Sequence, residues 1–324
     1  MMVERLIIRY PHFNHTKLQL NHCLNFSKIS AEPECILITG ERGAGKTTIM
    51  NSFASAFPRR ITSEGIIVPI LKGRVPAPAS PKSLVTSLLD ALGDPNPTKG
   101  TTTTQTIRLK KLMVECQVEM VLLDEFHQFI DRDSYAILYG AADWLKNLID
   151  DSRCPFALFG LGYSSVILKA NDQLERRFSM REKIEPFAWK PRETQTKNEP
   201  IFFKFLNHLD EGLPFVKSSN LNSNEMAFRI FYATEGVVGF IMKLIRRAAY
   251  FAIEADLESL NLKVLGKAYA ERLSHRDSQR RNPFLVEIEN LNLKDIATSK
   301  KETDRMPSVI KGKKSKLKEL IESI

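Results

Sequence analysis

Residues 35–48 have the sequence Cys35-Ile-Leu-Ile-Thr-Gly-Glu-Arg-Gly-Ala-Gly-Lys-Thr-Thr48. The first five form a short apolar run rich in β-branched side chains, which predicts a buried strand. The glycines, lysine and threonine after it fit the P-loop spacing G-x-x-x-x-G-K-(S/T), and a helix is expected from Thr47 to about Ala56. Glycines let several backbone N–H groups point at one phosphate, and a helix N-terminus adds partial positive charge there. The stretch therefore predicts an α/β fold that binds a nucleotide.

The residues of this loop have separate expected roles. Lys46 would reach the β- and γ-phosphates, and the Thr47 hydroxyl would hold Mg²⁺. The nucleotide-binding set that the motif predicts is Gly40, Glu41, Arg42, Gly43, Ala44, Gly45, Lys46, Thr47 and Thr48. A glycine-rich turn that binds no nucleotide is the alternative, and the strand before it and the helix after it argue against that alternative.

A second chemical stretch is an apolar strand that ends in two acids, Val118-Glu-Met-Val-Leu-Leu-Asp-Glu125. This is the Walker B arrangement. In a parallel sheet we expect this strand to lie beside the P-loop strand, so that its C-terminal end meets the metal. Asp124 would bind Mg²⁺ through water, and Glu125 would orient and polarise the attacking water. Paired acids also occur at ordinary strand ends, so this interpretation depends on the P-loop upstream.

Length and composition are those of a globular chain with one large domain or two. The chain has 324 residues and a formal net charge of +9, which permits nucleic-acid binding without establishing it. No run approaches the ~18 apolar residues of a membrane span, and the N-terminus lacks the build of a signal peptide. Four separated cysteines favour buried thiols in a reducing cytosol over disulfides or zinc ligands. We therefore expect a cytoplasmic protein without a membrane partner.

Further elements are predicted between and after these stretches. Strands are expected over 66–70, 155–160 and 183–187, an extended proline-rich loop over 71–81, and helices over 16–28, 83–92, 106–116 and 134–150. Tyr10 or Phe13 would either cover an adenine base or pack in the core. His127 follows the acidic pair without the nearby partners that a metal site needs, so we expect it near the nucleotide or at a subunit contact.

A pair of arginines precedes the last predicted strand, in Gln173-Leu-Glu-Arg-Arg-Phe178. Arg176 and Arg177 fit arginine fingers that reach the γ-phosphate held by a neighbouring subunit. They fit equally well a solvated helix end with a cationic last turn. The pattern leaves both interpretations open.

Composition also divides the chain into segments. The expected organisation is an N-terminal segment near the nucleotide over 1–34, a P-loop ATPase domain over 35–190, a small helical lid over 191–292 and a flexible basic tail over 293–324. The lid helices are expected over 201–209, 224–234, 238–255 and 262–276. Residues 316–324 can form a short helix when bound to a partner.

Together these features describe the AAA+ architecture: a P-loop parallel sheet flanked by helices, with a helical lid. In detail the chain resembles the TnsC/TniB family of transposition ATPases over about residues 5–275. The matching residues are Tyr10-Pro11, Gly40–Thr48, Val68-Pro69-Ile70 with the proline-rich loop, Leu88–Gly93, Leu123-Asp-Glu-Phe-His127, Gln173-Leu174, Arg177-Phe178 and Thr234-Glu-Gly236 with Gly239.

The resemblance implies a function and partners. It implies an ATPase that uses ATP and Mg²⁺, with catalysis by Lys46, Asp124 and Glu125 and with Arg176 or Arg177 acting in trans. Such a protein forms a homo-oligomeric ring or filament on duplex DNA in a prokaryotic cytoplasm, at the nucleoid. Its partners would be a TniQ-type targeting protein, alone or with a CRISPR-type guide-RNA complex, and a DDE transposase that stimulates hydrolysis and disassembly.

Two positions depart from the family pattern. The expected polar sensor after the third strand falls on Leu161 or Gly162, with Ser164 as a substitute. The lid position where related ATPases place an arginine is Gly239, so Lys243 or Arg246 would serve there. Both departures predict slow hydrolysis and leave nucleotide binding intact.

DNA contacts should be made to phosphates, because an assembly on arbitrary targets cannot depend on base sequence. The candidates, each with a solvated surface as the alternative, are Lys99, Thr101, Thr102, Thr103, Lys110, Lys111 and Arg132. Two rival functions use the same core: a helicase loader or replication initiator, and a signalling ATPase without a DNA role. Salt-sensitive duplex binding that requires ATP would favour the transposition regulator over both.

Overall fold

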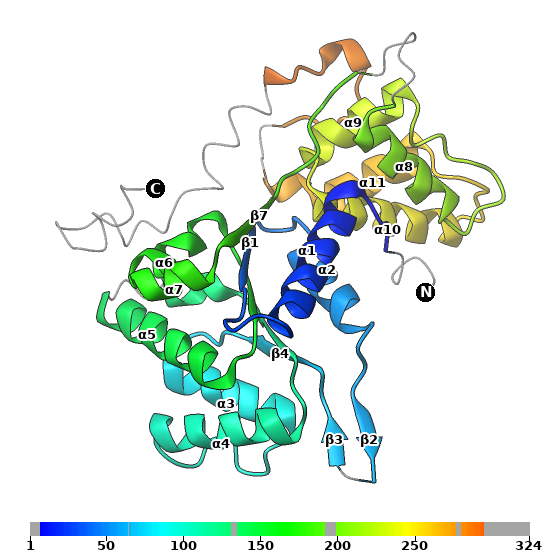
Figure 1. Ribbon diagram of the computed structural model, residues 1–324. Helices are drawn as coiled ribbons and strands as arrows, with labels where there is room; N and C mark the ends of the chain where they lie inside the picture. The colour runs from blue at the N-terminus through cyan, green and yellow to red at the C-terminus, as the bar shows by residue number, and fades with distance from the viewer. Residues whose placement is uncertain (1–6, 64, 131–134, 192–198, 277–279, 295–324) are drawn as a thin grey trace. The chain divides into compact units, whose positions relative to one another are not determined.

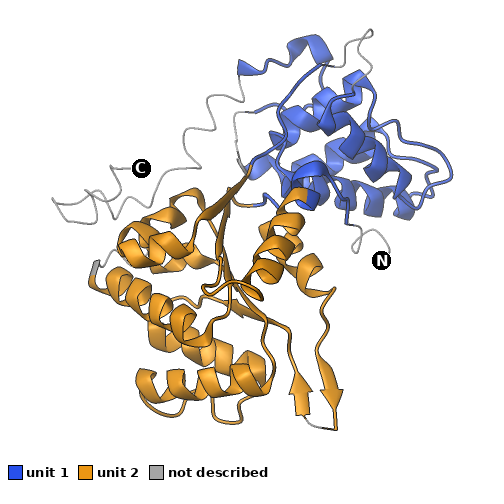
Figure 2. Ribbon diagram, viewed as in Figure 1, with its two compact units in different colours: residues 1–14, 43–45, 185–305 blue, residues 15–42, 46–184, 306–324 orange. Residues whose placement is uncertain are grey.

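The computed structural model describes residues 7–63, 65–130, 135–191, 199–276 and 280–294 (Figure 1). The chain forms two compact units (Figure 2). The sheet unit has its described residues within 15–42 and 46–184, and the helical unit has its described residues within 7–14, 43–45 and 185–294. In the described part of the chain, no helix combines the length and apolarity needed to cross a membrane.

The sheet unit is built on a five-stranded parallel sheet with the strand order β4-β5-β6-β1-β7 (Figure 1). The strands are β1 (Ile36–Gly40), β4 (Ile70–Arg74), β5 (Met120–Asp124), β6 (Phe156–Gly160) and β7 (Met180–Ile184). Every residue of β5 and β6 is buried, as in a parallel sheet covered on both faces. The predicted parallel sheet flanked by helices is confirmed.

The strand that ends in Asp124 does not lie beside the P-loop strand, and that prediction was wrong. β6 separates the two, because Phe159 pairs with Ile38 of β1 while Leu158 pairs with Leu123 of β5. Strand order in a parallel sheet is set by how the crossover helices pack, which a single strand's sequence does not specify. The inserted strand places its last residue, Gly160, between the ends of β1 and β5.

The strand predicted over 66–70 is divided in two. Residues on its N-terminal side form a separate antiparallel hairpin of β2 (Arg60–Thr62) and β3 (Gly65–Ile67). Pro69 has no N–H to donate to a ladder, so the sheet strand β4 starts only at Ile70. The Pro69 carbonyl accepts hydrogen bonds from the backbone N–H groups of Glu119 and Met120 and begins the pairing with β5. The predicted extended loop therefore begins after Arg74.

Helices flank the sheet, and side-chain caps mark the starts of α3 and α4. They are α1 (Pro11–Ser27), whose first turn belongs to the helical unit, α2 (Lys46–Ala54), α3 (Pro81–Leu92), α4 (Thr102–Glu115), α5 (Tyr135–Ser152), α6 (Val166–Lys169) and α7 (Asp172–Arg177), with 3₁₀ turns η2 (Phe126–Phe129) and η3 (Gly162–Ser165). Ser80 and Ser83 form a reciprocal capping box that starts α3. The Thr101 hydroxyl caps α4, so the helix predicted from Thr106 begins at Thr102.

The helical unit contains the four lid helices predicted from the sequence. They are α8 (Ile201–Glu211), α9 (Asn224–Thr234), α10 (Val238–Glu254) and α11 (Leu262–Arg272), followed by the short turns η4 (Ser274–Arg276) and η5 (Ile288–Asn290). Tyr10 and Phe13 are buried in this unit, and the Tyr10 ring lies 5.4 Å from that of Phe187 and 5.8 Å from that of Phe205. Core packing therefore accounts for both residues. The predicted tail lies, from residue 295 onward, outside the described residues.

Candidate nucleotide-binding site

The loop between β1 and α2 is shaped by glycines and followed by a lysine. Gly43 and Gly45 have φ angles of 85° and 95°, a left-handed conformation that favours glycine. Lys46 begins α2, and its Nζ donates hydrogen bonds to the carbonyl oxygens of Gly40 at 2.6 Å and Glu41 at 2.9 Å. The ammonium group is therefore fixed at the start of the helix, where the motif predicts the phosphates.

The charge of Lys46 is balanced by carboxylates of the same site. Burial lowers the pKa of Lys46, and the negative charges of Asp124, Glu125 and Glu41 oppose that shift. Of the other predicted loop residues, Arg42, Thr47 and Thr48 are exposed and Ala44 is buried. The lysine therefore lies in a partly desolvated setting, where its charge acts more strongly on a phosphate than it would in bulk water.

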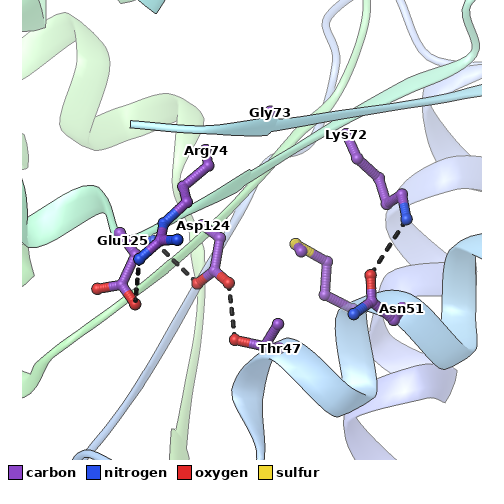
Figure 3. Close-up of a pocket in the computed structure, with 8 residues that line it drawn as sticks. Thr47, Asn51, Lys72, Gly73, Arg74, Asp124 and Glu125 are labelled. Atoms are coloured by element: carbon purple, nitrogen blue, oxygen red, sulfur yellow. Dashed lines mark hydrogen bonds and ion pairs between the residues drawn. The ribbon is translucent and has the colours of Figure 1, made fainter. Parts of the chain in front are cut away.

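The two residues predicted to hold Mg²⁺ are in direct contact (Figure 3). Thr47 Oγ1 donates a hydrogen bond of 2.7 Å to Asp124 Oδ2, although the two residues belong to α2 and β5. Asp124 is 6% exposed, and its Oδ1 accepts a 2.8 Å hydrogen bond from the backbone N–H of Glu125. A hydroxyl and a carboxylate oxygen at this spacing fit Mg²⁺, which takes few protein oxygens and keeps several waters.

Glu125 follows β5 in an unusual backbone conformation. Its φ of 57° is in the left-handed region, which is uncommon for a residue with a side chain. Its Oε1 lies 3.8 Å from the guanidinium of Arg74, and its Oε2 lies 3.2 Å from Nε2 of His127. His127 is therefore a buried neighbour of the predicted general base, which agrees with a place near the nucleotide.

A cavity of about 340 Å³ opens beside these carboxylates (Figure 3). Its lining residues are Thr47, Met50, Asn51, Lys72, Gly73, Arg74, Asp124 and Glu125. Lys72 and Arg74 come from β4, and Lys72 Nζ donates a 3.1 Å hydrogen bond to Asn51 Oδ1. Neither cation was predicted from the sequence, because the strand was expected over residues 66–70 and begins only at Ile70. The spacing of Lys72 and Arg74 could have indicated that both face the same side, since alternate residues of a strand share one face.

The tip of the P-loop belongs to the helical unit and contacts its helix α10. The Gly43 carbonyl accepts a 2.8 Å hydrogen bond from the backbone N–H of Gly239. A Cβ atom at Gly239 would lie 2.7 Å from the Gly43 oxygen, so the approach requires glycine. Gly239 is the position where related ATPases place an arginine, and here its backbone contacts the P-loop instead. Lys243 lies one turn further along α10, with Nζ 5.6 Å from the centre of the Phe240 ring.

The two candidate arginine fingers differ in their surroundings. Arg177 forms an ion pair with Glu32 and donates a 3.1 Å hydrogen bond from Nε to Asp150, and its side chain is 22% exposed. Arg176 is exposed in the last turn of α7, and no hydrogen bond or ion pair joins it to another described residue. Only Arg176 of this pair is therefore available to a second subunit without the loss of an internal contact.

Ser164, the substitute sensor, lies in η3, which follows β6. Its hydroxyl is buried and has no hydrogen-bond partner among the residues that the structure describes. A Cβ atom at Gly160 would lie 2.1 Å from this hydroxyl, so the serine packs directly against the strand end. The predicted alternatives, Leu161 and Gly162, lead into η3.

The candidate DNA contacts gather mainly on and just before α4. Lys99 is exposed in the preceding loop, Thr101 caps the helix, and Thr102 and Thr103 lie in its first turn. Further along α4, Lys110 pairs with Asp151 at 2.8 Å and Lys111 pairs with Glu115 at 3.6 Å. Ion pairs of this kind at the surface contribute little to stability. Arg132 lies outside the described residues.

Comparison with known proteins agrees with this arrangement. The family model described as bacterial TniB protein matches residues 2–190. No curated protein sequence matches the chain. Among solved structures, Cdc6p from Pyrobaculum aerophilum has a TM-score of 0.61 at 15% identity, with 84% of this chain and 70% of that chain covered. The ORC1 protein of Aeropyrum pernix in complex with DNA has a TM-score of 0.58 at 15% identity, with coverage of 85% and 69%. These likenesses concern the fold alone, and they agree with the predicted parallel sheet flanked by helices.

Proposed function

The chain belongs to the bacterial TniB family and is an AAA+ ATPase, and from this premise we propose that it regulates DNA transposition. It oligomerises on target duplex DNA when ATP is bound, links target selection to transposase recruitment and disassembles on hydrolysis. One observation carries the proposal, in a chain of this family. Thr47, at the start of the P-loop helix, donates a hydrogen bond to Asp124 at the end of β5, and Asp124 accepts another from the backbone N–H of Glu125. A TniQ-type targeting protein and a DDE transposase are the proposed partners.

The site residues divide the work of hydrolysis. Lys46 binds the β- and γ-phosphates, while Thr47 and Asp124 hold Mg²⁺, which neutralises charge on the phosphate oxygens when bound. Glu125 orients the attacking water and accepts its proton. Loss of the γ-phosphate then removes the group to which a neighbouring subunit is linked, so hydrolysis loosens the assembly.

Electron microscopy of the purified protein on long linear duplex DNA tests this proposal. We expect rings or filaments with ATP and none with ADP or without nucleotide, because the γ-phosphate is needed to join neighbouring subunits. The assemblies should weaken as salt rises, since the candidate contacts Lys99 and Thr101 to Thr103 would bind phosphates. Monomeric particles in every nucleotide state would contradict the oligomeric regulator and point to a protein client instead.

We propose Arg176 as the arginine that acts in trans. The Arg176→Ala variant should lose about a thousandfold of its DNA-stimulated ATPase rate, the lower range for an arginine finger. Arg177→Ala is the matched control, because Arg177 is held by Glu32 and Asp150. It should lower the free energy of unfolding by about 1–2 kcal/mol and keep most of the rate.

Steady-state ATPase assays with duplex DNA and thermal melting separate these two arginines. A rate loss in Arg177→Ala with Arg176→Ala unaffected would reverse the assignment. Mixing each variant with an excess of Glu125→Gln subunits adds a second test. An arginine that acts in trans should be supplied by the inactive partner, so Arg176→Ala sites should recover part of their rate in the mixture.

A further inference from the structure

We propose that His127 is a positioning residue that holds the Glu125 carboxylate in place for proton transfer, an inference that rests on the proposed role of Glu125 as general base. His127 Nε2 lies 3.2 Å from Glu125 Oε2, and the histidine side chain is only 4% exposed. Glu125 itself is about one third exposed, since it lines the cavity beside Asp124. A buried group thus contacts the reacting side chain from the interior of the protein.

The imidazole has little freedom to move. It belongs to η2, whose first and last residues, Phe126 and Phe129, are each 1% exposed in the core, with ring centres 5.6 Å apart. On its other side the His127 ring meets the Tyr163 ring of η3 edge to face, with centres 6.0 Å apart and an angle of 84°. The imidazole is therefore held between residues of η2 and of η3, which both belong to the sheet unit.

The Glu125 carboxylate needs such a support. The backbone of Glu125 has a left-handed conformation, and its N–H donates a hydrogen bond to Asp124 Oδ1. These backbone features do not hold the carboxylate of the side chain. The side-chain contact of Glu125 with Arg74 is longer, at 3.8 Å, and involves an arginine side chain that is 75% exposed. Exposed ion pairs of this kind restrain a side chain weakly. The shorter, buried contact with His127 is therefore the one that can fix the carboxylate.

The geometry also assigns the two carboxylate oxygens. Oε2 is occupied by His127, and Oε1 lies on the side of Arg74, a residue of the cavity wall. Oε1 is thus the oxygen that would accept the proton as the water O–H bond breaks and its oxygen bonds to the γ-phosphorus, while the bond to the ADP oxygen breaks. Misplacing a reacting group by about 1 Å can cost about a hundredfold in rate.

Three substitutions at His127 test the positioning role. His127→Leu fills the space without a donor and should lower kcat by about ten- to a hundredfold, with unchanged ATP affinity. His127→Gln can place an amide nitrogen near the position of Nε2 and should recover most of the rate. His127→Asn places its amide near Nδ1 instead and should stay as slow as leucine. Calorimetric ATP binding and thermal melting identify any variant that has lost its fold.

A double-mutant cycle with Glu125→Gln distinguishes positioning from a general structural effect. If His127 acts through Glu125, adding His127→Leu to Glu125→Gln should leave the residual rate unchanged. A further fall in rate in the double variant would overturn the proposal, and so would a wild-type kcat in His127→Leu beside a slow Glu125→Gln. A wild-type rate in Glu125→Gln would instead refute the general-base role, and the inference about His127 with it.

Discussion

The Lys46→Ala variant is expected to lose about a hundredfold in ATP affinity and, with it, every ATP-dependent assembly on DNA. The substitution removes a charged donor that is fixed by two carbonyl oxygens at the start of α2. A charge-assisted hydrogen bond of this kind contributes about 1.5–3 kcal/mol, and the upper value corresponds to about a hundredfold in affinity. Calorimetric titration with a slowly hydrolysed ATP analogue measures the loss directly.

A second lysine of the sheet unit serves as the control for this variant. Lys17 of α1 donates hydrogen bonds to the carbonyl and hydroxyl oxygens of Ser52, which is on the same helix as Lys46 but does not line the cavity. Lys17→Ala should therefore bind ATP as the wild type does. Normal ATP affinity in Lys46→Ala would show that the phosphates bind elsewhere and would contradict the proposed site.

The Glu125→Gln variant should bind ATP normally and hydrolyse it about a hundred- to a thousandfold more slowly. Glutamine keeps the shape of the side chain but cannot accept a proton from water, and general-base catalysis contributes about 10²–10⁴-fold. Because ATP would persist, complexes on duplex DNA should outlive those of the wild type by a similar factor. Single-turnover hydrolysis and the lifetime of DNA complexes after dilution measure the two effects.

The opposite end of β5 offers a matched control for that variant. Glu119 precedes the strand and pairs with Lys28 at the surface, so Glu119→Gln makes the same chemical change away from the site. It should leave both the rate and the lifetime unchanged. Hydrolysis at the wild-type rate in Glu125→Gln would require a different general base.

Local sequence patterns predicted which residues meet at the candidate site, and long-range packing determined the features that these patterns missed. The P-loop turn, its helix and the acidic strand end depend on residues close in sequence, and the structure joins Thr47 to Asp124 as the motifs implied. The order of the strands and the place of β4 depend on how distant elements pack, so the cations Lys72 and Arg74 were not anticipated.

The same limit applied to side chains whose partners are remote in sequence. Arg177 is held by Glu32 and Asp150, and nothing in the local pattern indicates either contact. His127 was expected near the nucleotide, yet its contact with Glu125 depends on the left-handed backbone conformation of Glu125, which the residue types do not specify. The motif predicted the residue types of the site, and the structure added the contacts from which we propose roles for Arg176 and for Oε1 of Glu125.

The contact between Gly43 and Gly239 limits which substitutions these two positions can tolerate. Both residues are already the smallest available, so no substitution at one position can make room for a side chain at the other. In a library of all single substitutions, both positions should be depleted although neither has a side chain, and second-site suppressors should not arise within the pair. Among related chains we therefore expect the two glycines to be retained together.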